Sequence, residues 1–227
     1  IASSLWFVTV VYSIGYMRAH REAHQTRFYL FFALAIAATV GAALAANLLT
    51  LYVFYEALTL ATYPLVTHGG TDKDRVGGRT YLIILLGTSL TMLLLAMAWT
   101  WSLTGTLAFV DGGLFMEGDS LIDGVTPGLI VVLFALFVFG TGKAALMPFH
   151  RWLPAAMVAP TPVSALLHAV AVVKLGVFTI LKVSIYTFGI GTLVKVDAGQ
   201  LLQYVAAATL LIAAVIAIRE DNLKLRL

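Results

Sequence analysis

Five ionisable side chains lie in stretches of sequence that are otherwise almost entirely apolar. Each charged group at the centre of a membrane-spanning helix costs roughly 2.5–3.5 kcal/mol or more. Carboxylate, ammonium and imidazole groups can each bind and release a proton. The residue types therefore predict transfer of protons, or of small cations, between groups shielded from water. The five residues are Glu56, Lys143, His150, His168 and Lys174.

A buried glutamate and lysine can act together as a switch. Burial without a partner favours the neutral form of both groups, whereas a nearby opposite charge favours the charged forms. If Glu56 and Lys143 form a pair, separating or neutralising it drives Lys143 to release its proton to a next acceptor. His168 and Lys174 are the candidate acceptors, and a neutral lysine can take up another proton to reset the switch.

Glu56 is also part of a polar stripe. Glu56, Thr59 and Tyr63 share one helical face because of their i, i+3, i+7 spacing. The stripe is a candidate lining for a hydrated path, although threonine and tyrosine in such helices also serve packing.

Each buried charge has a structural interpretation as well. Glu56 and Lys143 could form an ion pair that only holds helices together. His168 could be a hydrogen-bonded histidine within a bundle, and Lys174 could extend its ammonium towards a membrane interface.

Two further basic groups lie near the predicted ends of apolar segments. His150, beside Trp152, is either a proton-path residue or an interfacial group. Lys182 is interpreted as a snorkelling anchor.

The composition identifies the environment of these groups. The chain has 227 residues, of which 61% are apolar and only 11% charged, against roughly a quarter charged in soluble domains. Its mean hydropathy is +0.97. The sequence has no cysteine, which excludes disulfides, thiolate metal sites and cysteine nucleophiles. A net charge of only +3 argues against nucleic acid as a partner. These values predict an integral membrane protein with the lipid bilayer around it.

The apolar segments predict an all-α polytopic transmembrane helix bundle. A helix needs about 20 apolar residues to cross the hydrocarbon layer. The run 28–68 is too long for one span, so a tight hairpin is expected at Ala46–Asn47. Seven segments then qualify as spans: 1–17, 28–46, 48–67, 80–104, 127–157, 161–187 and 200–218.

Two of these spans are not expected to be regular helices. Gly140, Gly142 and Pro148 predict a break near 142–148, because glycine loosens a helix and proline removes a backbone donor. The sixth span begins at Pro160-Thr-Pro162 and has Gly176 in its middle. Transporters use broken helices to present helix ends to ions.

Basic residues alternate between the loops as the positive-inside rule requires. Seven alternating crossings put ten basic residues on one side and only Lys195 on the other. Segment 105–126 has acidic residues but no lysine or arginine. We therefore expect the odd-numbered spans to end in the cytoplasm. The ten are Arg18, Arg21, Arg27, Lys73, Arg75, Arg79, Arg151, Arg219, Lys224 and Arg226.

Other patterns carry no chemistry. Residues 140–143 resemble part of a phosphate loop but lack its first glycine and its final serine or threonine. His20 and His24 have a metal-ligand spacing but suit a solvated loop better, so no metal site is expected. No cofactor, haem or nucleophile–base arrangement is predicted. The chain starts within an apolar run and stops after a basic segment, so we expect it to be a fragment.

Three stretches resemble one protein family. Residues 47–63 (NLLTLYVFYEALTLATY) resemble the glutamate-bearing helix of antiporter-like proton-pumping subunits. Residues 142–157 (GKAALMPFHRWLPAAM) and 160–176 (PTPVSALLHAVAVVKLG) resemble its broken helix and the helix that follows, and 219–224 (REDNLK) is similar to the loop before its second repeat. The family includes membrane subunits of respiratory complex I (NADH:quinone oxidoreductase), Mrp-type cation/proton antiporters and membrane-bound hydrogenases.

The resemblance implies a domain organisation and residue roles. The chain would be one transmembrane domain, 1–227, with a preceding helix at 1–17, the first five-helix repeat at 28–187 and the start of a second at 200–227. Glu56 and Lys143 would form the coupled pair, and His168 and Lys174 the relay. Having both relay residues on one helix looks more like Mrp-type or hydrogenase-linked members than some complex I subunits.

The implied function is proton translocation in a multisubunit assembly, coupled to NADH:quinone oxidoreductase-type electron transfer. The redox centres would belong to other subunits, so no catalytic site is expected in this chain. A Na⁺/H⁺ antiporter component is the first alternative, and a non-pumping structural membrane subunit is the second. The implied partners are other membrane subunits of a complex I-like or Mrp-like assembly, in a bacterial or archaeal inner membrane.

Overall fold

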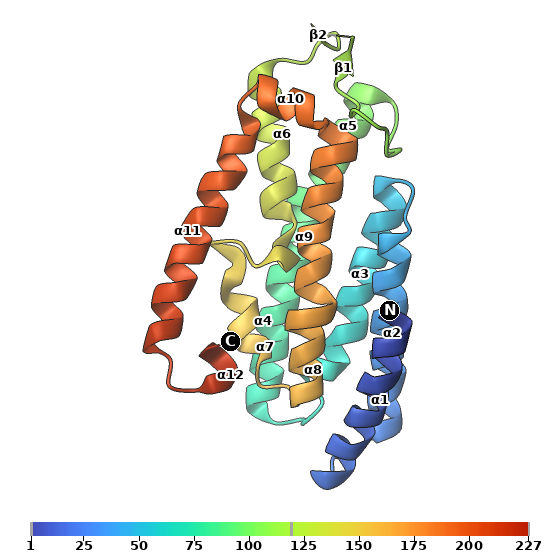
Figure 1. Cartoon of the computed structure of the whole chain (residues 1–227), viewed down its shortest axis with the longest axis vertical. Helices are drawn as coiled ribbons and strands as arrows, with labels where there is room; N and C mark the ends of the chain where they lie inside the picture. The colour runs from blue at the N-terminus through green and yellow to red at the C-terminus, as the bar shows by residue number, and fades with distance from the viewer. Residues whose placement is uncertain (1, 119, 227) are drawn as a thin grey trace.

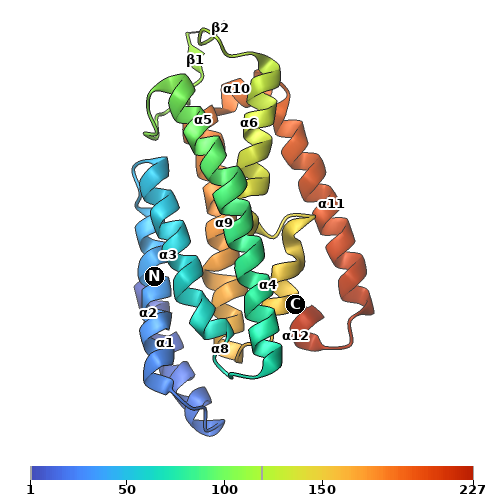
Figure 2. The same cartoon turned by 180° about the vertical axis from the view of Figure 1, so that it is seen from behind.

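The computed structural model describes residues 2–118 and 120–226 and is built almost entirely of helices. Long helices run alongside one another in a bundle, with the last long helix at its edge (Figure 1, Figure 2). Within the described residues the only strands are β1 (Met116–Glu117) and β2 (Ser120–Leu121), which pair in one loop. The expected all-α bundle is confirmed.

Five helical stretches are long and apolar enough to cross a membrane, and they overlap five of the predicted spans. Predicted span 1–17 is α1 (Ala2–Ala19), and predicted span 127–157 is broken into short pieces. Short helices α10 (Ile190–Lys195) and α12 (Leu223–Arg226) flank the last long one. The five stretches are α2 (Gln25–Ala43), α3 (Leu48–Val66), Asp72–Thr104, Thr161–Phe188 and α11 (Ala198–Arg219).

The hairpin predicted at Ala46–Asn47 connects α2 and α3. Asn47 is the N-cap of α3, and its side chain accepts the backbone N–H of Thr50 at 2.7 Å. A capped start leaves fewer unsatisfied donors at the tip of the hairpin. Helices α2 and α3 consequently pack antiparallel along their length.

Lys182 is predicted to be an anchor at the membrane interface, and the structure gives its ammonium defined hydrogen-bond partners. Its ammonium donates to the carbonyls of Ala45 at 2.5 Å and Ala43 at 3.4 Å, where α2 ends. A cation is stabilised there because the C-terminal end of a helix carries partial negative charge. Lys182 therefore ties its own helix to the α2–α3 hairpin.

The break predicted near 142–148 is confirmed. Helix α6 (Pro127–Gly140) ends just before it, and the chain continues through two 3₁₀ turns into α7. A Cβ on Gly140 would lie 2.5 Å from the backbone nitrogen of Leu93. The break is thus packed tightly against a neighbouring span. The turns are η2 (Gly142–Ala144) and η3 (Phe149–Arg151), and α7 is Trp152–Ala156.

Gly176 permits the closest approach to the broken segment, so Gly176→Ala is expected to destabilise the fold. A Cβ at this position would overlap the backbone of Lys143 and Ala144, which cannot move as a flexible side chain can. Overpacking of this kind costs about 1–3 kcal/mol. Thermal unfolding in detergent would measure the loss, with Gly87→Ala as the control because nothing lies within 4 Å of a Cβ there. Equal melting of the two variants would contradict the packing.

Two long spans contain π-helical turns that the sequence analysis did not predict. One stretch runs α4 (Asp72–Thr88), η1 (Ser89–Leu93) and α5 (Leu94–Thr104). The other runs α8 (Thr161–Ala165), η4 (Leu166–Val170), α9 (Val172–Lys182) and η5 (Val183–Phe188). Such turns are frequent at functional sites. The two irregularities of the second stretch are η4, which contains His168, and η5, whereas Gly176 lies within the regular helix α9.

A buried histidine joins two loops at the basic end of the bundle. The side chain of His68 is 1% exposed, its Nε2 lies 4.0 Å from a Glu22 carboxylate oxygen, and its ring meets Phe28 edge-on. Burial lowers the pKa of His68, and the Glu22 carboxylate opposes this shift only in part. His68 is therefore neutral at neutral pH.

This lowered pKa predicts a loss of stability in acid. As pH falls below about 6.5, the unfolded chain binds a proton at His68 before the folded protein does, so the free energy of unfolding decreases. The slope is at most about 1.4 kcal/mol per pH unit for one proton. Melting temperatures between about pH 7.5 and pH 5 should fall less steeply in His68→Asn than in the wild type. Exposed His20→Asn is the control, and an unchanged slope in His68→Asn would refute the assignment.

Candidate functional site

Lys143 is the centre of the site. Its side chain is fully buried in the 3₁₀ turn η2. The ammonium donates to Thr59 Oγ1 at 2.6 Å and lies 3.2 Å from the centre of the Tyr55 ring. The backbone N–H of Lys143 donates to the Tyr55 hydroxyl at 3.2 Å. Two residues one turn apart on α3 therefore hold both the side chain and the backbone of the broken segment.

Glu56 lies on α3 between these two contacts. Both of its carboxylate oxygens are buried, and neither has a hydrogen-bond partner in the described part of the chain. Glu56 directly follows Tyr55, whose ring lies beside the Lys143 ammonium. No ion pair within 4.0 Å joins the two groups among the described residues. Thr59 is thus the direct partner of the ammonium, and Glu56 lies on the same helix, α3.

A second set of contacts supports the broken segment from the other side. The indole N–H of Trp152 donates to the Gly142 carbonyl at 2.9 Å, and the same carbonyl accepts the backbone N–H of Ala145 at 3.0 Å. The Trp152 ring meets Tyr81 edge-on, with ring centres 5.5 Å apart. The Tyr81 hydroxyl is 2.5 Å from Thr62 Oγ1 on α3. Helices α3, α4 and α7 therefore jointly fix the position of η2.

The polar stripe on α3 divides between two surfaces. Thr59 contacts Lys143 inside the bundle, as described above. Tyr63 lines an outer groove together with Arg75 and Arg79. The predicted stripe is therefore not one continuous lining.

The proposed relay residues take no part in the contacts that hold the Lys143 side chain. His168 is half-buried in the π turn η4, and its Nδ1 is buried without a hydrogen-bond partner in the described chain. Lys174 is exposed on the surface of the described bundle. His150 is half-buried in η3 and also has a buried Nδ1 without a partner there. Among the described residues, no hydrogen bond joins the side chain of Glu56 or Lys143 to His150, His168 or Lys174.

The sequence analysis missed the aromatic side chains of the site. Tyr55 and Trp152 were not identified as site residues, although the indole N–H and the phenol O–H of such buried rings usually have a partner. In the sequence, Tyr55 is marked as a site residue only by its position next to Glu56, and Trp152 only by its position within the broken segment. Among the described residues, no group of three or more histidine, aspartate or glutamate side chains could hold a metal ion.

Thr59→Val is expected to impair any transport that depends on Lys143. Valine keeps the volume of threonine but leaves the buried ammonium without its hydroxyl acceptor, which costs about 1–3 kcal/mol. Ion transport should fall roughly 5- to 150-fold if this cost appears in the rate-limiting step. Thr59→Ser should retain most activity because it keeps the hydroxyl. Equal rates in the valine and serine variants would remove Thr59 from the site.

The fold and the site define a class of protein. The chain is an integral multi-pass membrane protein with an ammonium and a carboxylate buried between its helices. The family described as "NADH:quinone oxidoreductase/Mrp antiporter, TM" matches residues 45–227, and the chain belongs to this family.

Curated relatives come from both branches of the family. The chain is 31% identical over 223 residues to a Na(+)/H(+) antiporter subunit of Alkalihalophilus pseudofirmus, covering 96% of this chain and 26% of the relative. It is 29% identical over 230 residues to NAD(P)H-quinone oxidoreductase chain 5 of Picosynechococcus, covering 99% of this chain and 33% of the relative. The chain therefore spans about a quarter to a third of the length of these relatives.

Solved structures show the same fold. The Mrp complex from Dietzia contains a chain that superposes with a TM-score of 0.75 at 30% identity, over 88% of this chain and 21% of that one. An archaeal membrane-bound sulfane sulfur reductase superposes with a TM-score of 0.72 over 88% of this chain and 39% of that one. At 24% identity, the second likeness shows the fold alone. The predicted family and the multi-pass helical fold are both confirmed.

Proposed function

We propose that this chain supplies a Glu56–Lys143 proton switch to one subunit of an Mrp-like or complex I-like membrane assembly. The observation that supports the proposal is the fully buried Lys143 ammonium, held by Thr59 beside a buried carboxylate that has no hydrogen-bond partner in the described chain. Both groups belong to the family resemblance, and relatives from both branches match nearly the whole chain.

The switch would alternate between two arrangements. While Glu56 is ionised, its field stabilises the ammonium of Lys143. When Glu56 takes up a proton, the contacts that remain to stabilise the buried charge are the Thr59 hydroxyl and the face of the Tyr55 ring. Lys143 then releases one proton and becomes a neutral amine. Loss of the Glu56 proton restores the field, and Lys143 binds a new proton.

We assign the onward transfer to the helix that carries His168 and Lys174. Gly176 on α9 touches the backbone of Lys143, so this helix is the direct neighbour of the switch. The π turn at His168 is a local irregularity that a change at Lys143 could displace. Lys174 would require further helices of a longer subunit to cover it, since it is exposed on the described bundle. His150 would serve as a second proton carrier beside the broken segment.

A purely structural role is less well supported. An ion pair that only holds helices together requires direct contact between its charges. The described residues contain no Glu56–Lys143 ion pair within 4.0 Å. Hydrogen bonds from Lys143 to Thr59 and Tyr55 already join the broken segment to α3 without Glu56.

The driving reaction has two candidates because the relatives belong to two kinds of assembly. Similarity to the relative named NAD(P)H-quinone oxidoreductase chain 5 favours coupling to electron transfer. Similarity to the relative named as a Na(+)/H(+) antiporter subunit favours sodium exchange. Inverted membrane vesicles containing the full assembly and a pH-sensitive dye would separate the two. Acidification on NADH addition supports the first, and proton release on Na⁺ addition to acidified vesicles supports the second. No proton movement under either condition would refute the proposed function.

A further inference from the structure

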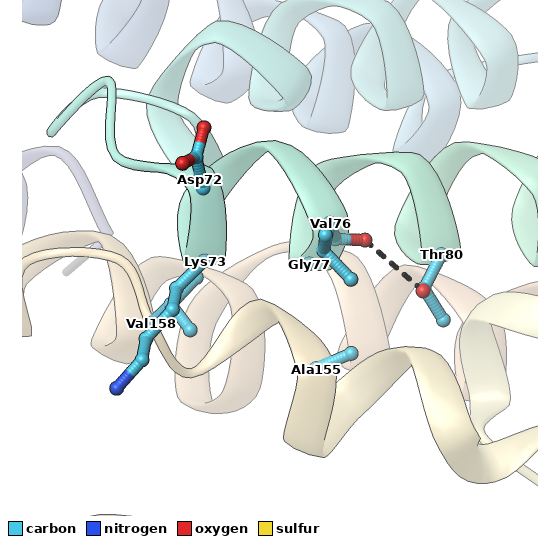
Figure 3. A pocket seen from close by; sticks show the side chains of 7 residues that line it. All are labelled: Asp72, Lys73, Val76, Gly77, Thr80, Ala155 and Val158. Atoms are coloured by element: carbon cyan, nitrogen blue, oxygen red, sulfur yellow. Dashed lines mark hydrogen bonds between the residues drawn. The ribbon is translucent and has the colours of Figure 1, made fainter.

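Two grooves flank the first turns of α4 at the end of the bundle that carries most of the basic residues. One lies between α4 and α7; it has an apolar wall and Lys73 and Asp72 at its mouth (Figure 3). The other lies between α3 and α4, with a volume of about 580 Å³. We call the second one the arginine groove. Its lining residues are Tyr63, Arg75, Val76, Arg79, Leu82 and Ile83.

The lining of the arginine groove contains two arginines and no acidic residue. Arg75 and Arg79 are four residues apart on α4, so they lie on one face of the helix. The only ion pair either makes among the described residues is Arg75–Asp72 at 3.9 Å, with side chains 74% and 100% exposed. Such exposed pairs contribute little. The carboxylate of Asp74 is buried and accepts the backbone N–H of Thr71, so it does not face the guanidinium groups.

The rest of the groove is apolar and leads away from this charge. Leu82 and Ile83 follow Arg79 by about one helical turn, which is roughly 5 Å further along the span. Val76 and the ring of Tyr63 complete the wall. The charged rim of the groove at the membrane edge thus continues into an apolar surface groove that runs towards the bilayer centre.

We propose that the arginine groove binds an anionic phospholipid. The headgroup phosphate would accept hydrogen bonds from Arg75 and Arg79, and an acyl chain would lie against Leu82 and Ile83. Guanidinium groups suit this role because they bind phosphate oxygens in pairs. A free phosphate ion would use only the rim, and an apolar partner helix would leave both guanidinium groups unpaired. The combination of rim and wall therefore favours a lipid.

The neighbouring groove provides an internal comparison. Its lining has one acidic and one basic residue, Asp72 and Lys73, and its floor is closed where Gly77 meets the Ala155 carbonyl (Figure 3). It could hold an acyl chain but has no basis for selecting a headgroup. Selectivity for anionic lipid should therefore depend on Arg75 and Arg79 and be independent of Lys73.

Native mass spectrometry of the delipidated, fully assembled complex would test the proposal. Phosphatidylglycerol and phosphatidylcholine with identical acyl chains are the probes. We expect tighter binding of phosphatidylglycerol, and about 30-fold weaker binding of it in the double variant Arg75→Gln/Arg79→Gln, since each arginine near an anionic headgroup contributes about a factor of five. Binding of phosphatidylcholine should not change. The matched control is Arg21→Gln/Arg219→Gln, which removes two exposed charges from the same side of the membrane.

A second experiment needs no variant. Phosphatidylglycerol with a photoreactive acyl chain should label residues 76–83 of the wild-type complex. Equal affinity for both lipids, or equal weakening by the control pair, would show only general attraction to basic loops and overturn the proposal. Labelling elsewhere, or cross-linking of this segment to a neighbouring protein subunit, would also overturn it.

Discussion

Glu56→Gln is expected to abolish proton transport while the assembly remains intact. Glutamine has nearly the same shape as glutamate but cannot ionise, so the field that acts on Lys143 disappears. A positioned proton-transfer group typically contributes about 100-fold or more to a rate, and the loss should be at least of this size. Dye-monitored proton uptake in inverted vesicles would measure it.

The stability of the Glu56→Gln variant separates transport from structure. Neither oxygen of the carboxylate has a hydrogen-bond partner in the described chain, so its neutralisation should not destabilise the bundle. We expect an unchanged amount of assembled complex and an equal or higher melting temperature. Glu117→Gln is the control, because Glu117 is exposed in a loop. An assembled Glu56→Gln complex that pumps at the wild-type rate would refute the proton switch.

Lys143→Met is the second substitution with a large expected effect. Methionine fills the volume of the lysine stem but cannot carry a proton, so transport should fall about 100-fold or more. Replacing a buried charge by an apolar group of similar volume is often neutral or stabilising. Loss of transport without loss of stability is therefore the expected result, measured by vesicle proton uptake and by thermal unfolding.

The same pair of measurements distinguishes the competing interpretation of Lys143. If the lysine only holds helices together, Lys143→Met should lower the melting temperature and reduce the amount of complex. Any complex that still assembles should then pump normally. Lys73→Met controls for removal of an exposed lysine.

Several features of the fold could be predicted because single residue types determine them. Asn47 between two apolar runs indicated the hairpin, and its side chain caps α3. Gly140 and Pro148 indicated the broken span, which begins directly after Gly140. Lys143 in that break was expected to be buried, and it is fully buried. In each case one residue type, a capping asparagine, a glycine, a proline or a charge within an apolar run, marks the structural feature in the sequence.

Other features depend on contacts between distant segments, which helical spacing does not encode. The π turn around His168 has no glycine or proline within it. Tyr63 shares a helical face with Thr59, yet it lines the arginine groove. Its ring lies beside Gly78 of α4 and not beside Lys143. The exposure of Lys174 also depends on which helices cover α9, so its location midway along a span could not predict it.

Infrared difference spectroscopy during turnover would test the central claim most directly, because the C=O stretch of a protonated carboxylic acid reports on Glu56 itself. The proton switch predicts a carboxylic acid band that appears and disappears with transport in the wild-type assembly. This band should be absent in Glu56→Gln and should no longer change in Lys143→Met, where Glu56 has lost the charge it responds to. A transporting wild-type assembly whose carboxylic acid bands are the same as those of Glu56→Gln would contradict the account.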